Sequence, residues 1–159
     1  MHTSLNKHIT FHTADCAFVL RDKTAIRSWL TAICRAEKKK IESLSYVFCS
    51  DEYLYDMNVQ FLKHKTLTDI ITFDFSGGDK KLNGEIYISI DRVKENAATL
   101  GLRFSDELRR VIIHGFLHMM GYSDKSSSKK VKMTKKEDAC LSLWNVPRGT
   151  RNTRAKNRP

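Results

Sequence analysis

The sequence predicts an α+β domain in which a small mixed β-sheet of about four strands packs with helices, one of them central. Short segments with alternating apolar residues, typical of strands, separate longer segments in which apolar residues recur at helical spacing. One of these helical segments, residues 105–120, is apolar nearly all round, which is typical of a helix buried in the middle of a domain. With 159 residues, 41% of them hydrophobic, the chain can form one domain with a substantial core.

The first half of the chain is expected to alternate two strands with two helices. A short strand surrounds Ile9, and Asp22 can cap a helix that ends at the basic run Lys38–Lys40. This run suits a solvated helix end better than a binding patch, because cations are favourable there. Residues 44–49 form the second strand, and Ser50 begins the next helix. The inner positions of the two helices are Ile26, Trp29, Leu30 and Ile33, then Leu54, Met57, Asn58 and Phe61.

The second half begins with two strands, residues 69–75 and 84–90, and continues with three helices. A glycine-containing loop separates the strands, so an antiparallel hairpin is expected. The last helix is expected to end at about Trp144. Asp91 and Ser105 are the expected N-terminal caps of the first two of these helices, and Ser126–Ser128 precede the last one.

The charge of the chain favours a polyanionic partner. The formal net charge is +10, which attracts nucleic acid or an anionic membrane over long range. Residues 148–159 hold five arginines and lysines and no acid, so half of this charge belongs to a basic tail that we expect to be disordered. A single folded domain is therefore expected over residues 1–147.

Cysteine usage and hydropathy favour a cytoplasmic protein. The four cysteines are widely spaced, form no C-x-x-C pair and lie mostly among apolar residues, so reduced core thiols are expected. No long apolar run and no charged-then-apolar leader is present in the sequence, so no membrane association is expected.

A metal site is predicted at the end of the central helix. His114 and His118 are one turn apart, and residues i and i+4 project side by side, so both rings can reach one ion. Gly121 can end the helix and return the chain, which makes Asp124 the expected third ligand. The alternative is that the histidines are polar residues at the rim of a packed helix and Asp124 an ordinary loop acid.

Three nitrogen and oxygen ligands leave the fourth position of a tetrahedral zinc ion for water, as in catalytic zinc sites. One divalent metal ion, with zinc favoured, is therefore expected, and its water could attack a phosphodiester. A peptidase of the H-E-x-x-H type is disfavoured, because Gly115 stands where those enzymes carry the glutamate that acts as the base.

The pattern His-Gly-x-Leu-His-x-x-Gly-Tyr occupies residues 114–122, and further motifs lie at Thr68–Phe73, Gly84–Ile86, Met133 and Glu137, within residues 44–144. Together they resemble the signature and the further motifs of the YbeY family of bacterial metal-dependent endoribonucleases. The resemblance implies the same α+β fold and cleavage of single-stranded RNA in ribosomal RNA processing, at the 3′ end of the small-subunit RNA. It also implies the ribosomal RNA precursor and the small ribosomal subunit as partners.

Two positions depart from the family pattern. The family has a third histidine where this chain has Asp124, and this oxygen ligand also suits harder ions such as manganese. Leu62 stands at the position of a family arginine, so Lys63 and Lys65 are the nearest candidates for a phosphate contact, although both could be solvated loop lysines.

The sequence assigns no catalytic base beyond water held by the metal. Glu85 and Asp69 lie on strands that could face the central helix and are weak candidates, because each could equally be a carboxylate at the rim. An endoribonuclease is the favoured function. The alternatives are a metallohydrolase of another substrate class and a non-catalytic, metal-stabilised RNA-binding domain.

Overall fold

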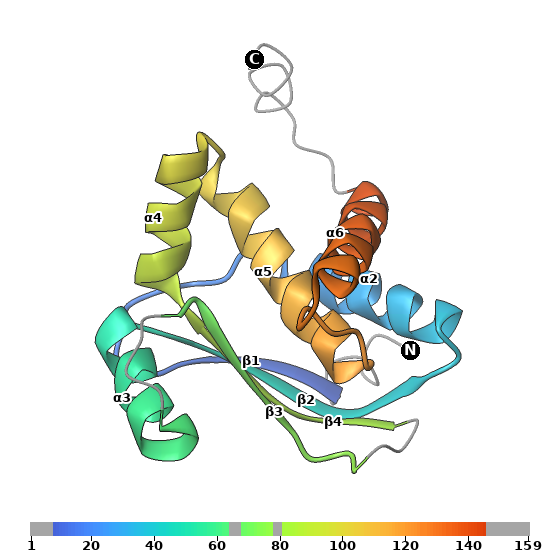
Figure 1. Ribbon diagram of the computed structural model, residues 1–159, viewed down its shortest axis with the longest axis horizontal. Coiled ribbons are helices and arrows are strands. Elements are labelled where there is room, and N and C mark those ends of the chain that lie inside the picture. The colour runs from blue at the N-terminus through green and yellow to red at the C-terminus, as the bar shows by residue number, and fades with distance from the viewer. Residues whose placement is uncertain (1–7, 64–67, 78–80, 146–159) are drawn as a thin grey trace.

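The computed structural model describes residues 8–63, 68–77 and 81–145 as four strands and five helices (Figure 1). Their order along the chain is the predicted one, and the α+β class is confirmed. The elements are β1 (Ile9–Thr13), α2 (Lys23–Ala36), β2 (Lys40–Cys49), α3 (Asp51–Leu62), β3 (Ile70–Asp74), β4 (Lys81–Ser89), α4 (Ile90–Leu100), α5 (Phe104–Met119) and α6 (Ser127–Ser142).

The four strands form one mixed sheet in the order β1-β2-β4-β3. The pairs β1·β2 and β2·β4 are parallel, with Leu44 of β2 opposite both Ile9 and Gly84. β3 runs antiparallel to β4, with Ile71 opposite Tyr87, so the predicted hairpin is confirmed. Strand β4 begins three residues before the predicted start at Gly84, because its pairing with β2 extends to Lys81.

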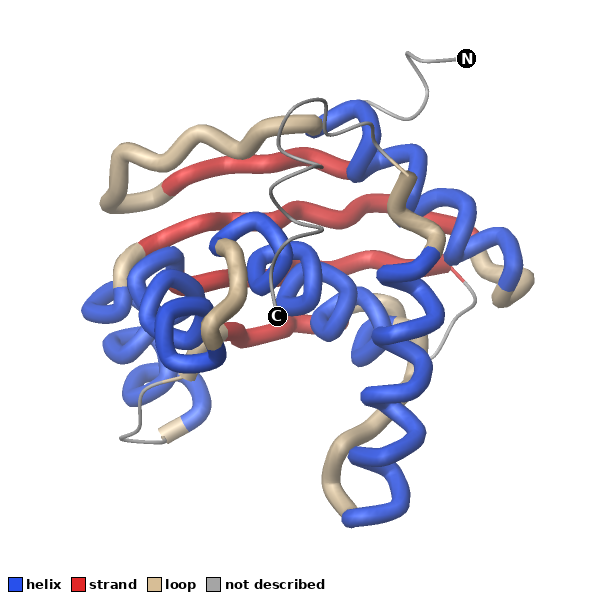
Figure 2. Tube along the Cα trace, turned by 90° about the horizontal axis from the view of Figure 1, so that it is seen from above, coloured by secondary structure: helices blue, strands red, loops and turns tan. Residues whose placement is uncertain are grey.

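Most of the core lies between one face of the sheet and the helices α2, α4, α5 and α6, and Figure 2 is viewed from the side of these helices. Because side chains alternate across a strand, Ile86 and Ile88 of β4 face this core while Tyr87 faces the other side. On that second face, α3 packs Leu54 and Met57 against β3 and β4 in a smaller cluster. The sheet therefore separates two layers, and α5 lies in the larger one.

Helix α5 is the central helix that the apolar run predicted. It contacts α4, α6, β3 and β4, and nine of its residues are buried. Gly115 allows this close approach, since a Cβ atom there would lie 2.7 Å from Cδ1 of Ile70 and 3.1 Å from Cγ2 of Ile86. The hydroxyl of Tyr46 donates a hydrogen bond of 3.0 Å to the Ile112 carbonyl, which ties the helix to β2.

Three predicted helix caps are wrong. Ser89 caps α4 by accepting from the Arg92 amide, and Asp91 accepts instead from the Asp51 amide at the start of α3. Helix α5 begins before Ser105, with Arg103 at its N-cap position and no side-chain cap. Asp22 precedes α2 but adopts a left-handed conformation in which its side chain makes no capping bond.

The predicted starts of α3 and α6 are confirmed, and the structure shows that Ser50 caps α3 by accepting from the Tyr53 amide and Ser126 caps α6 by accepting from the Lys129 amide. All four cysteines are free, and three of them are buried. The tail 148–159 lies outside the described residues, and within the described ranges no helix has the length and apolar character needed to cross a membrane.

Candidate metal centre

The last turns of α5 bring the two predicted histidines together. The Nε2 atoms of His114 and His118 lie 3.0 Å apart, and the ring centroids are separated by 4.6 Å. Both side chains are about a quarter exposed, so their nitrogen atoms are open to a ligand at the edge of a buried helix.

Asp124 joins the histidines because the chain turns back after α5. Gly121 has a φ angle of +102°, which L side chains rarely adopt, and this turn redirects the chain. Asp124 Oδ2 then lies 3.5 Å from both histidine Nε2 atoms. The structure therefore brings together all three ligands that the sequence predicted, with their ligand atoms within 4.8 Å of one another.

The geometry suits a single metal ion. In a tetrahedral site with ligand distances of about 2.1 Å, the ligand atoms lie about 3.4 Å apart. The observed separations of 3.0 and 3.5 Å match this spacing. Two imidazoles and one carboxylate leave at least one coordination position open, which is the arrangement of catalytic rather than structural sites.

A hydrogen-bonded cluster holds the loop that carries Asp124. The hydroxyl of Tyr122 and the ammonium group of Lys136 each donate a 3.0 Å bond to the carboxylate of Glu37 on the segment after α2. The Lys136 bond is the largest cause of the lowered pKa of Glu37, so this carboxylate stays ionised. Lys39 also donates to the Met120 carbonyl at 2.6 Å. These bonds fix the start of the return loop against α2 and α6.

Glu137 of α6 orients the first histidine. Its carboxylate hydrogen-bonds to Nδ1 of His114, and its other oxygen accepts a 2.9 Å bond from Arg110. The Glu137 bond raises the pKa of His114 above its usual value, more than burial lowers it. In the neutral ring this bond places the proton on Nδ1 and leaves the Nε2 lone pair for the metal, as in carboxylate–histidine–metal triads.

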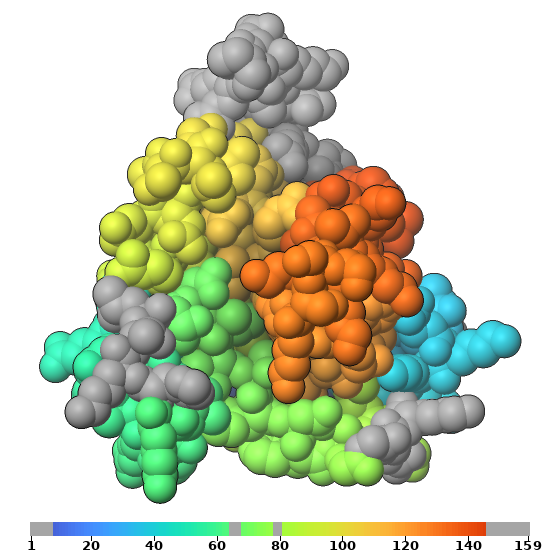
Figure 3. All heavy atoms as spheres, in the orientation of Figure 1, coloured from blue at the N-terminus to red at the C-terminus, as the bar shows by residue number. Residues whose placement is uncertain are grey.

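Sequence reasoning did not assign this role to Glu137. A signal was present, because the buried residues of the otherwise polar α6 are Met133, Glu137 and Cys140, at helical spacing. An acid within the inner stripe of a helix requires a partner when buried. The packing of α6 on α5 decides which partner this acid finds. Figure 3 shows α6, in orange, beside the green surface of β3 and β4.

The two candidate bases have different surroundings. Asp69 precedes β3 close to His114, and burial raises its pKa while the charge of His114 partly opposes this. The pKa of the buried Glu107 is also raised, mainly by burial and next by the negative charge of Asp69. Glu85 instead alternates with Ile86, so it shares the face of α3 and accepts a 3.1 Å bond from Tyr87. The charge of His114 therefore acts on Asp69, whereas Glu85 bonds to Tyr87 on the face of α3.

One of the two predicted phosphate contacts, Lys63, lies at the end of α3. Lys63 follows the helix in a left-handed conformation and is exposed, and Leu62 beside it is 43% exposed. Lys65 lies outside the described residues.

The fold and the site together define a class: an α+β fold whose central helix presents two histidines and whose return loop adds a carboxylate, a candidate site for one metal ion. A family model described as Endoribonuclease YbeY matches residues 8–145. Proteins named Endoribonuclease YbeY from Cytophaga hutchinsonii and Flavobacterium psychrophilum are 51% and 46% identical to the chain. These matches cover 85% and 81% of this chain and 94% and 91% of the two relatives. The chain belongs to the YbeY endoribonuclease family.

A solved structure supports the fold independently. The solution structure of a Thermotoga maritima protein superposes with a TM-score of 0.60 at 25% sequence identity. The match covers 89% of this chain and 99% of that protein, so it includes nearly the whole domain.

Proposed function

We propose that the chain is a metal-dependent endoribonuclease that cleaves single-stranded RNA during ribosomal RNA processing, at the 3′ end of the small-subunit RNA. The observation that carries this proposal is the convergence of His114, His118 and Asp124 on one point, with an open coordination position, in a member of an endoribonuclease family. The partners would be the ribosomal RNA precursor and the small ribosomal subunit, and the site of action the cytoplasm.

These three ligands suit zinc better than manganese, because two imidazoles and one carboxylate recur in catalytic zinc sites. When bound, such an ion supplies Lewis-acid activation of water and of a phosphate oxygen. The side chains around it orient the reactants. Glu137 holds His114 with Nε2 free to bind, and the Tyr122–Glu37 bond holds the loop that presents Asp124.

Asp69 is the proposed general base. It lies near His114, and its raised pKa makes the carboxylate a stronger proton acceptor than an exposed aspartate. Glu85, the other candidate, is directed to the far face of the sheet by strand alternation and is bonded to Tyr87. Asp69→Asn should therefore lower the cleavage rate more than Glu85→Gln, with metal content retained in both variants.

Lys63 and Lys65 are the proposed contacts to phosphate groups next to the cleaved bond. Exposed Lys63 follows α3 and precedes the segment that leads to Thr68 and Asp69. The double variant Lys63→Ala, Lys65→Ala should reduce cleavage of single-stranded RNA while metal content and melting temperature stay at wild-type values. Wild-type cleavage kinetics in this variant would assign the phosphate contact to other residues.

The proposed function is tested with single-stranded RNA, double-stranded RNA and a fluorogenic peptide, each with and without a chelator. We expect cleavage of single-stranded RNA only, its loss on chelation, and its loss in His118→Ala. Peptide cleavage would indicate another hydrolase. If the protein binds RNA but no metal-loaded preparation cleaves it, the chain is an RNA-binding domain and not an enzyme. Elemental analysis of the purified protein identifies the bound metal.

A further inference from the structure

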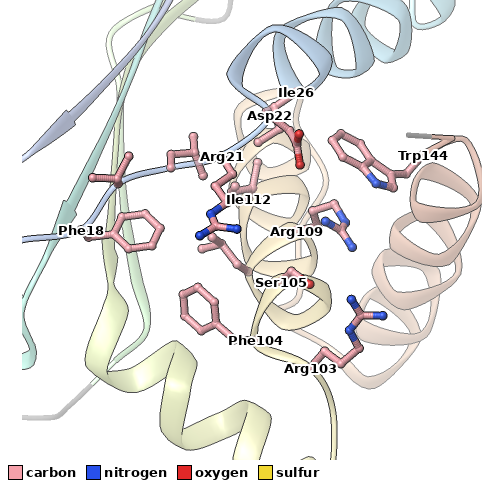
Figure 4. Close-up of a pocket in the computed structure, with 13 residues that line it drawn as sticks. Phe18, Arg21, Asp22, Ile26, Arg103, Phe104, Ser105, Arg109, Ile112 and Trp144 are labelled. Carbon is pink, nitrogen blue, oxygen red and sulfur yellow. The ribbon is translucent and has the colours of Figure 1, made fainter. Parts of the chain in front are cut away.

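A cavity of about 410 Å³ lies at the opposite end of α5 from the histidines. Figure 4 shows its walls, which come from the segment before α2, the first turns of α5 and the residue Trp144 after α6. None of its lining residues belongs to the candidate metal centre. The chemistry of the lining falls into two groups, the cations Arg21, Arg103 and Arg109 and the aromatic residues Phe18, Phe104 and Trp144.

The cations give the cavity an excess of positive charge. Three arginines and one acid, Asp22, line it, and the guanidinium groups gather around the same space in Figure 4. Arg109 is held in place, because it donates a 2.7 Å bond to Asp106 and lies 4.8 Å from the centre of the Trp144 ring. Within the described ranges, the side chains of Arg21 and Arg103 make no hydrogen bond or ion pair. Two guanidinium groups are therefore available to an anion.

The aromatic residues form a rigid, partly apolar wall. Phe104 packs edge to face with Phe18 at 6.0 Å, and Trp144 packs edge to face with Trp29 at 5.3 Å. Planar rings beside unpaired arginines form the combination that binds single-stranded nucleic acid, since the rings stack on a base and the cations contact phosphate.

We propose that this cavity binds one nucleotide of the RNA substrate, away from the cleaved bond, with its phosphate on Arg21 and Arg103 and its base against Phe104. The inference rests on the proposed function, because it takes RNA as the substrate. An RNA strand is the occupant favoured by the formal charge of +10.

The position of the cavity predicts a dependence on RNA length. Ten residues of α5 separate Phe104 from His114, which corresponds to about 15 Å along the helix axis. A stacked strand advances roughly 3.4 Å per nucleotide, so at least about five nucleotides are needed to join the two sites. A short oligonucleotide can occupy only one of them.

The test compares binding of a 20-mer and a 4-mer of nuclease-resistant 2′-O-methyl RNA to the metal-loaded full chain, by fluorescence anisotropy. Arg21→Ala with Arg103→Ala should raise the Kd of the 20-mer about tenfold at 0.1 M salt and reduce the logarithmic salt slope by about 1.4, at about 0.7 for each phosphate contact. The variant should thereby lose most of the preference for the longer RNA. Phe104→Leu, which keeps apolar volume but removes the ring, should raise the Kd of the 20-mer about fivefold.

The matched control is Lys81→Ala with Lys94→Ala, which removes the same charge at exposed positions outside the cavity and should keep the wild-type slope. Melting temperature and metal content verify that every variant is folded. An equal loss in the control, or an unchanged Kd in the arginine variant, would overturn the proposal. If the arginine variant loses binding of adenosine monophosphate but keeps the wild-type Kd for the 20-mer, the cavity binds a free nucleotide and the proposal is wrong. Failure of the proposed function would appear separately, as absence of RNA cleavage by the wild-type protein.

Discussion

Removal of Glu137 should weaken metal binding although Glu137 is not itself a ligand. Its buried carboxylate bonds to Nδ1 of His114 and accepts a second bond from Arg110. Without it, the imidazole loses the partner that sets its orientation and tautomer. Loss of such a partner costs 10–100-fold in metal affinity, or about 1.4–2.7 kcal/mol. We therefore expect Glu137→Ala to raise the Kd of the metal within this range.

Glu137→Gln should have a smaller effect, because the amide oxygen can still accept from Nδ1 while the negative charge is lost. The matched control is Asp138→Ala, since exposed Asp138 binds the same Arg110 at 2.7 Å but does not contact His114. The assay is competition with a chromophoric chelator, with melting curves to verify folding. A metal Kd within twofold of wild type in Glu137→Ala would refute the reasoning, and so would an equal effect of Asp138→Ala.

Three further predictions concern the ligands and the packing beneath them. Asp124→Ala should sharply reduce bound metal in elemental analysis, while Ser123→Ala should not; a full metal equivalent in the first variant would exclude Asp124 as a ligand. The pKa of His114 is raised above 6.5, chiefly by Glu137, so protons compete with the metal and affinity should fall with decreasing pH, beginning above pH 6.5. A metal Kd that stays constant from pH 8 to 6 would contradict this sign. Gly115→Ala should lower the free energy of unfolding, measured in denaturant titrations, by about 1–3 kcal/mol, because the new Cβ would meet the end of the Ile70 side chain. Gly84→Ala should cost more, because its Cβ would lie 2.2 Å from the backbone oxygen of Phe73, which cannot move aside as a side chain can. A larger loss in Gly115→Ala than in Gly84→Ala would refute the packing argument.

The local features of the chain were predictable because they depend on short stretches of sequence. Strand alternation and helical spacing predicted the nine elements in order, although three helix caps were wrong. Asp91 shows why caps are harder to predict. An acid next to a helix start can bond within its own helix or to a neighbouring one, and here it caps α3 across the structure.

The predicted site was also local. His114 and His118 are one turn apart on a single helix, and the left-handed turn at Gly121 needs only the residues around it. Their convergence with Asp124 follows from an 11-residue stretch of sequence, so it could be predicted before the rest of the fold was described.

Only the tertiary structure decided which distant residues complete the site. Glu137 reaches His114 because α6 packs on α5, and Glu37 holds the return loop because α2 lies beside it. Asp69 and Glu85 were equivalent candidates in the sequence, and the pleat of the sheet directs Glu85 to the far face. The sequence by itself determined the strands, the helices and the ligand motif, since these depend on neighbouring residues. The partners of that motif were decided by the packing of helices and strands, since contacts between distant segments exist only once the core has formed.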